Sequence, residues 1–141
     1  MGRAAAGDWL SVEAEHEGRP LLIRARSFAE RVPADPSLQM LMVMERAYAV
    51  SDGVALPGPA DTEILEWLQR ELFEEGEALG LLMLVLVETG AGRVRYYAYV
   101  RDPDAVMARI DEVCGPEFEI DLAADEDPYW NIYTQIVEGL T

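Results

Sequence analysis

The chain contains no lysine, one cysteine and one histidine, and the scarcity of cysteine and histidine excludes several classes of protein. Because Cys114 stands alone, no internal disulfide can form, and nothing in the composition indicates an oxidising compartment. One histidine and one cysteine cannot supply the ligands of a usual zinc site. The longest apolar run, residues 81–87, is too short to cross a bilayer, and the first residues lack the apolar stretch of a signal peptide. We therefore expect a cytoplasmic protein that does not associate with membranes.

Acidic residues dominate the charged side chains of the chain. Twenty-seven Asp and Glu residues face eleven Arg residues, which gives a formal net charge of −16. Residues 61–77 carry seven acids against one Arg, and residues 110–141 carry nine acids and no base. Such a field repels nucleic acid and anionic lipid and attracts basic surfaces. An equally open interpretation is that the charge only keeps the protein soluble.

Hydrophobic periodicity predicts a single α+β domain over residues 8–141, after a flexible tail at residues 1–7. Half of the residues are apolar, and a chain of this length buries enough surface to hold a core. The predicted elements, in chain order, are strands at 9–15, 20–27 and 38–50, a helix begun by Asp61, strands at 79–88 and 93–101, a helix begun by Asp102-Pro103, a strand at 117–122, and a short terminal helix or irregular cap at 128–137.

The last six main elements have the order β-α-β-β-α-β, which predicts a ferredoxin-like split βαβ unit. Such a unit has an antiparallel sheet with its helices on one face. An N-terminal β-hairpin and a C-terminal aromatic cap are added to it. The strands at 38–50 and 79–88 are apolar on both faces, so the second sheet face must also be covered. Three covers remain open: the aromatic C-terminal segment, a second copy of the chain in a homodimer, or a partner protein.

No set of residues has the pattern of an active site, a metal site or a cofactor site. His16 is predicted in a hairpin turn, with Ser11 near in sequence but no sign of a strained nucleophile elbow or an oxyanion hole. Cys114 is predicted at a helix C-terminus, where the dipole disfavours a thiolate. Residues 125–127 lack the glycine and the distal Glu of a calcium loop. Residues 90–92 lead into a strand rather than a helix, unlike a phosphate-binding loop. We predict a non-enzyme without metal or cofactor, although a carboxylate-only active site would leave no readable trace.

One strand carries a nucleic-acid signal. Residues 95–100 resemble part of the RNP1 pattern of RNA recognition motifs and fall on the third strand of the predicted unit, where that pattern belongs. However, Tyr96 replaces the glycine of the pattern, Asp102 replaces its last aromatic residue, and the net charge of −16 opposes phosphate contacts. An RNA-binding module is therefore the lowest of three functional hypotheses. In the alternative interpretation, Tyr97 and Tyr99 cover the second sheet face against the aromatic cap.

Several short motifs together resemble the bacterial domain of unknown function 695 family. They are Trp9, Ile23-Arg24-Ala25-Arg26, Tyr97-Ala98-Tyr99 followed by Asp102-Pro103, and Asp127-Pro128-Tyr129-Trp130 with Tyr133. The resemblance spans nearly the whole chain, and Asp-Pro-x-Trp-x-x-Tyr is its most specific part. The family has no established activity, so the resemblance implies architecture and transfers no catalytic residue. Some members resemble the type B regulator of ribonuclease E activity, an acidic ferredoxin-like inhibitor, by analogy of fold and charge alone.

The leading functional hypothesis is a non-enzymatic protein that neutralises a basic protein partner, such as an immunity protein against a bacterial toxin. The second is a regulator or inhibitor of a ribonuclease or an RNA-processing assembly. In both, acidic side chains steer the partner and an aromatic side chain anchors it. The predicted partner-binding residues are Glu112, Glu117, Glu119, Asp121, Asp125, Glu126, Asp127, Tyr129 and Trp130.

Overall fold

The computed structural model describes residues 8–16, 18–27, 37–48, 57–90, 92–115 and 118–140 of the 141-residue chain. The predicted tail at residues 1–7 and the predicted binding residue Glu117 lie outside these ranges. Within them, no helix combines the length and the apolar character that a membrane span requires.

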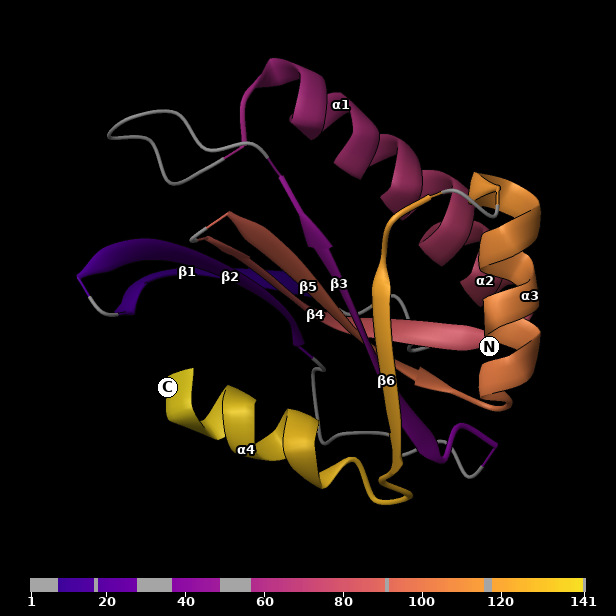
Figure 1. Cartoon of the computed structure of the whole chain (residues 1–141). Helices are drawn as coiled ribbons and strands as arrows, with labels where there is room; N and C mark the ends of the chain where they lie inside the picture. The colour runs from indigo at the N-terminus through magenta and orange to yellow at the C-terminus, as the bar shows by residue number, and fades with distance from the viewer. Residues whose placement is uncertain are drawn as a thin grey trace.

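Six strands of the described residues form one antiparallel sheet in the order β1-β2-β4-β5-β3-β6 (Figure 1). Their bounds are β1 Asp8–His16, β2 Arg19–Ser27, β3 Met40–Ala47, β4 Leu82–Gly90, β5 Arg93–Val100 and β6 Asp121–Glu126. β1 and β6 are the edge strands, because each pairs with one neighbour in the described part of the chain. The predicted α+β class, the antiparallel sheet and the N-terminal hairpin are confirmed.

Three helical stretches flank the sheet in the described residues. The first is continuous and comprises α1 Pro59–Leu68, the π-helical segment η2 Gln69–Glu74 and α2 Glu75–Ala78; the others are α3 Pro103–Cys114 and α4 Asn131–Leu140. The prediction that Asp61 begins the first helix is wrong. Gly58 is its N-cap residue and Pro59 its first residue, so Asp61 lies inside the first turn. Asp102 does begin α3, because its carboxylate accepts a hydrogen bond from the Asp104 amide at 3.0 Å.

The last strand forms later in the chain than its sequence pattern predicts. β6 pairs antiparallel with β3, from Glu126 opposite Met40 to Asp121 opposite Glu45. Residues 118–120 alternate as a strand would, yet Phe118 and Ile120 pack against the core from the connection that precedes β6. The strand bounds are therefore set by where β3 offers a partner rather than by the local alternation.

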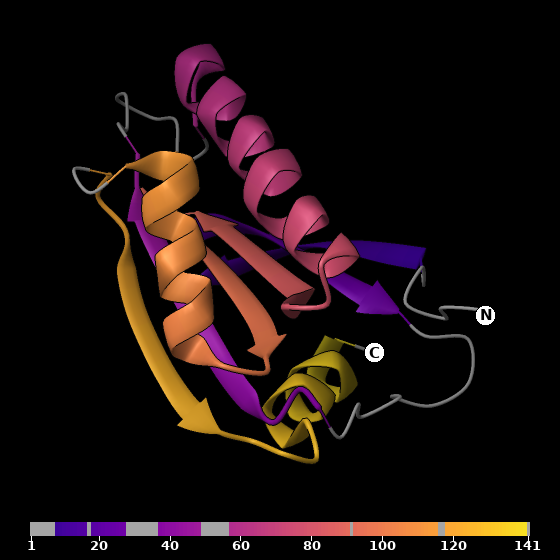
Figure 2. The ribbon, with the colours of Figure 1, turned by 90° about the vertical axis from the view of Figure 1, so that its right-hand side faces the viewer.

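The larger core lies between the sheet and the helices α1, η2 and α3 (Figure 2). Met42 and Met44 of β3 and Leu84 of β4 face this layer and are almost completely buried. From η2, the ring of Phe73 stacks on the ring of Tyr96 with centroids 4.6 Å apart. Burial of such side chains supplies the main favourable contribution to folding.

The opposite face of the sheet is covered by α4, so the sheet lies between two helical layers (Figure 1). A bulge in β4 shifts the register between Leu84 and Leu86, and both Val85 and Leu86 therefore face α4. This explains why β4 is apolar on both faces. Of the three covers that the sequence left open, the structure shows the chain's own C-terminal segment.

Candidate functional site

Exposed acids surround the free edge of the sheet at β6. We call these five residues the acidic edge: Glu112, Glu119, Asp121, Asp125 and Glu126. They come from the last turn of α3, from the connection after it, and from β6, which lies beside α3 at the rim of the molecule (Figure 2). The Glu112 side chain remains 75% exposed although Arg109 lies 3.7 Å away. Five of the nine predicted binding residues thus lie exposed along or beside the edge strand β6, with Asp121 and Asp125 on one face of the strand and Glu126 on the other.

One arginine lies next to the acidic edge but forms no ion pair with it among the described residues. The Arg46 guanidinium donates to the backbone carbonyl of Glu119 at 2.9 Å. It also lies over the Phe118 ring, 4.2 Å from the centroid. Arg46 therefore fixes the connection into β6 and, unlike Arg109 with Glu112, pairs with none of the edge carboxylates.

The aromatic motif after β6 divides into one exposed and two buried residues. Tyr129 is 76% exposed, whereas Trp130 is fully buried and Asp127 is 6% exposed. Trp130 and Asp127 therefore do not belong to a surface that a partner would meet, which corrects their assignment as binding residues. Of the two predicted aromatic anchors, only Tyr129 is available, directly beyond the end of β6.

Asp127 caps the helix α4. Its Oδ1 accepts a hydrogen bond from the Asn131 amide, and its Oδ2 accepts one from the Ile132 amide, each at 2.9 Å. The Tyr99 hydroxyl donates to the same Oδ2 at 2.6 Å. The first amides of a helix have no partner within it, and a carboxylate there also interacts favourably with the helix dipole. One carboxylate thereby joins the start of α4 to β5.

Trp130 and Tyr133 hold α4 on the sheet. The Trp130 ring stacks on Tyr99 with centroids 4.4 Å apart and planes 4° apart, and its Nε1 donates to the Leu38 carbonyl at 2.9 Å. The Tyr133 hydroxyl donates to the Arg26 carbonyl, and the Tyr133 amide donates to the Tyr99 hydroxyl at 3.2 Å. Burial is the main cause that raises the pKa of the Tyr99 hydroxyl, and its hydrogen bond to the Asp127 carboxylate raises it further. This tyrosine therefore stays neutral.

We call Tyr99, Asp127, Trp130 and Tyr133 the α4 clamp. Its members include the Asp, the Trp and the Tyr of the Asp-Pro-x-Trp-x-x-Tyr motif. The contacts of these three residues dock a helix onto a sheet, and none of them faces an open site. The motif is therefore explained by architecture in this chain.

A buried ion pair ties the hairpin to the first helix. Arg26 donates through two nitrogens to the Glu77 carboxylate, at 3.1 and 3.2 Å, and the Leu84 amide donates to Glu77 at 3.2 Å. The Arg26 guanidinium also lies over the Trp9 ring, 5.0 Å from its centroid. This two-bond geometry pairs the two charges, although the buried Nε of Arg26 has no hydrogen-bond partner among the described residues. Arg26 is therefore a structural residue.

The strand with the RNP1-like sequence packs inside the molecule rather than presenting a stacking platform. Tyr99 lies under α4, and the Tyr97 hydroxyl donates to Glu88 at 2.5 Å. Burial raises the pKa of Tyr97 to about 12. Arg93 and Arg95 both pair with Glu45, at 2.5 and 2.6 Å. Tyr99 thus covers the second sheet face against the cap, as the alternative interpretation predicts.

Among the described residues, no group of three His, Cys, Asp or Glu side chains could hold a metal ion. Cys114 is half-buried, and burial raises the pKa of its thiol. The structure does not describe the side chain of His16.

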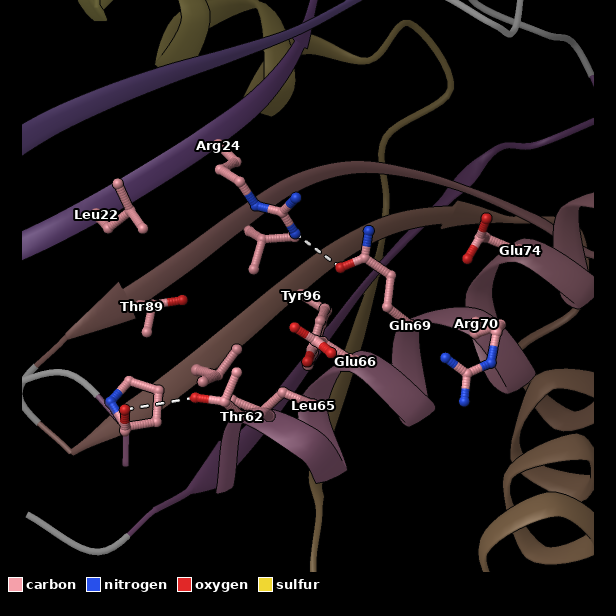
Figure 3. Close-up of a pocket in the computed structure, with 13 residues that line it drawn as sticks. Leu22, Arg24, Thr62, Leu65, Glu66, Gln69, Arg70, Glu74, Thr89 and Tyr96 are labelled. Carbon is pink, nitrogen blue, oxygen red and sulfur yellow. Dashed lines mark hydrogen bonds between the residues drawn. The ribbon is translucent and has the colours of Figure 1, made fainter. Parts of the chain in front are cut away.

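A cavity of about 670 Å³ lies between α1, η2 and the sheet (Figure 3). Arg24 projects into it from β2 and donates to Gln69 Oε1 at 2.7 Å. On the helix side, the Thr62 hydroxyl donates to the Pro57 carbonyl at 3.4 Å. The sequence predicts no site here, because the lining residues come from separate strands and a helix and share no local motif.

A family model described as "Family of unknown function (DUF695)" matches residues 7–137. The chain belongs to this family. The family resemblance drawn from the motifs of the sequence is confirmed, and the α4 clamp lies inside the matched range. No curated protein and no solved structure matches the chain.

Proposed function

We propose that this DUF695 protein is a non-enzymatic binding protein that neutralises a basic protein partner, such as a toxin countered by its immunity protein. The acidic edge is the observation that carries this proposal. Five exposed carboxylates surround an edge strand, and the exposed ring of Tyr129 follows directly after it.

Electrostatics and strand geometry support the same surface. A cluster of one sign of charge accelerates the encounter with an oppositely charged partner and orients it. β6 also leaves one side of its backbone without a strand partner among the described residues, so a partner can add a strand there. An exposed tyrosine can anchor such a complex, because its ring is large and rigid.

Capture from an extract of the native host tests the proposal with a matched pair of variants. The edge variant carries Asp121→Asn, Asp125→Asn and Glu126→Gln. The control variant carries Glu13→Gln, Glu63→Gln and Glu75→Gln, which removes the same charge from exposed positions of β1, α1 and α2. We expect wild type and control to retain one basic protein at low salt, and the edge variant to lose it. Equal retention by the edge variant, or binding indifferent to salt, would contradict the proposal.

The second candidate is a regulator that inhibits a ribonuclease or an RNA-processing assembly. The same acidic edge supports it, since the surface fits any basic partner. Gene neighbourhood and the identity of the captured protein separate the two functions. A toxin gene directly upstream favours immunity, whereas a solitary gene and a captured ribonuclease favour regulation.

We also propose that β3 to β6, with α1 and α3, form a ferredoxin-like unit. The order β4-β5-β3-β6 within the sheet supports this, because the first strand of the unit lies between its third and its last. Helices α1 and α3 on one face agree with that arrangement. An experimental structure that superposes on ferredoxin-like domains over these elements would support the proposal, and one with another strand order would end it.

A further inference from the structure

The cavity beside α1 contains a cation without an acidic partner. The half-buried Arg24 donates to the Gln69 side chain, and its guanidinium carbon lies 5.4 Å from the centroid of the Trp9 ring. No carboxylate of the described residues forms an ion pair with Arg24, although acids outnumber bases by 27 to 11 in the chain. A neutral amide accepts a hydrogen bond but does not balance the charge.

Neighbouring arginines of the sheet show the contrast. Arg26, two residues further along β2, pairs with Glu77 through two hydrogen bonds. Arg93 and Arg95 share the carboxylate of Glu45. In a protein so rich in acids, the Arg24 guanidinium is thus available to an anion that enters the cavity, whereas Arg70, which also lines it, pairs with Glu71.

Apolar side chains form the inner wall of the cavity. Leu22, Leu65, Val87, Val94 and Tyr96 contribute to it from three strands and α1. The volume of about 670 Å³ suits a small organic molecule, since such sites measure roughly 300–1,000 Å³. A ligand with an apolar body therefore fits better than an inorganic anion, which would leave this wall without a partner.

The helical wall contains the π-helical segment η2, which supplies Gln69, Arg70 and Glu74 to the cavity. A π-helical segment interrupts the regular α-helical hydrogen bonds, and such segments occur frequently at functional sites. In this chain the segment begins at the residue that meets Arg24 (Figure 3). The π-helical backbone of η2 therefore begins next to the Arg24 guanidinium, which has no acidic partner among the described residues.

Charges at the mouth restrict the ligand further. Glu66, Arg70 and Glu74 line the cavity and are exposed. Two carboxylates there repel a ligand with several negative charges, such as a nucleotide. A ligand with a single carboxylate avoids most of this repulsion and still pairs with the guanidinium below.

We propose that this cavity binds a small organic monocarboxylate. The carboxylate of the ligand pairs with the Arg24 guanidinium, which matches its two oxygens in a bidentate geometry. The apolar body of the ligand lies against Leu22, Val87 and Tyr96. The site is distinct from the acidic edge, because β2, β4 and β5 form it while β6 lies beyond β3 in the sheet.

Titration of the ¹⁵N-labelled full chain with hexanoate, 3-phenylpropanoate and indole-3-acetate tests the proposal by NMR. We expect at least one of these acids to shift the amide signals of residues 22–24 and 65–69 in a saturable way. The uncharged 3-phenylpropanamide is expected to bind roughly tenfold more weakly than its acid, the usual effect of losing one charge-assisted hydrogen bond.

Variants then locate the binding. Arg24→Gln is expected to weaken the acid roughly tenfold or more, while Arg101→Gln, an equal loss of charge outside the cavity, leaves the affinity unchanged. Leu65→Trp fills the cavity without altering its charge and should also abolish binding. If Arg24→Gln does not fold, the affinity of Leu65→Trp for the acid tests whether the cavity is the binding site. The proposal is overturned if no acid of the panel shifts these signals, if acid and amide bind equally, or if the cavity variants bind as the wild type does.

Discussion

Asp127 is a residue whose burial could not be predicted from the sequence around it. It follows Asp125 and Glu126 in one acidic run, yet Asp125 is exposed and Asp127 is buried under three hydrogen bonds. Local composition cannot separate these carboxylates, because the difference depends on which one meets the first amides of α4. The same holds for Tyr129, which is 76% exposed, and Trp130, which is fully buried and has a φ of 57°.

Replacing Asp127 by Asn is expected to lower the free energy of unfolding by about 2–3 kcal/mol, because charge-assisted hydrogen bonds to two amides and a hydroxyl are weakened. Asp125→Asn removes the same charge from the exposed strand and should cost at most about 0.5 kcal/mol. Urea unfolding of both variants measures the difference. Equal effects would mean that Asp127 does not cap α4.

Glu45 provides a pH-dependent test at the same scale. Its hydrogen bond with Arg95, with a further contribution from Arg93, lowers the pKa of the Glu45 carboxyl below its usual 4.5. Since the pKa in the folded protein is depressed, the stabilisation is present above the unfolded pKa and is lost as the pH falls through the folded pKa. We expect Glu45→Gln to lower stability by about 0.5–1 kcal/mol at neutral pH.

The measurement compares urea unfolding of wild type and Glu45→Gln between neutral pH and about pH 3, since the pair loses its charge as the carboxyl protonates. The difference should shrink once the pH falls below 4.5. Glu63→Gln serves as control, because Glu63 forms no ion pair among the described residues. A constant difference across the range would show that the Glu45 charge does not contribute.

At the scale of elements, the sequence predicted those parts that carry their own start and stop signals. Asp102-Pro103 begins α3 and Gly115, with a φ of 86°, follows its end, so this helix could be placed from local residues. The start of α1, the bounds of β6, and the bulge beside Val85 depend on partners far away in the chain. The π-helical segment left no pattern that the sequence could reveal.

The docking of α4 is the element-scale claim that variants can test. Trp130→Ala removes a stacked ring and its bond to Leu38 from the buried face, and should cost about 3–5 kcal/mol. Ile132→Ala, on the exposed side of the same helix, should cost less than about 1 kcal/mol. Hydrogen exchange of the α4 amides should accelerate in the first variant alone. Unchanged protection in Trp130→Ala would contradict the clamp.

At the scale of the whole molecule, the two candidate sites lie apart. The cavity belongs to the α1 side of β2, β4 and β5, and the acidic edge belongs to β6. From the sequence, the acidic edge could be predicted as an acid-rich stretch, since its five residues all lie between positions 112 and 126. The cavity could not, because Leu22, Leu65 and Val94 become neighbours only when the sheet and helix pack.

Hydrogen exchange of the captured complex, compared with the free chain, tests the central claim most directly. The partner is expected to protect the amides of residues 119–129, on β6 and around Tyr129, and to leave β1 and the cavity strands unchanged. Protection confined to β1, α1 or the cavity, with β6 exchanging as in the free chain, would contradict binding through the acidic edge.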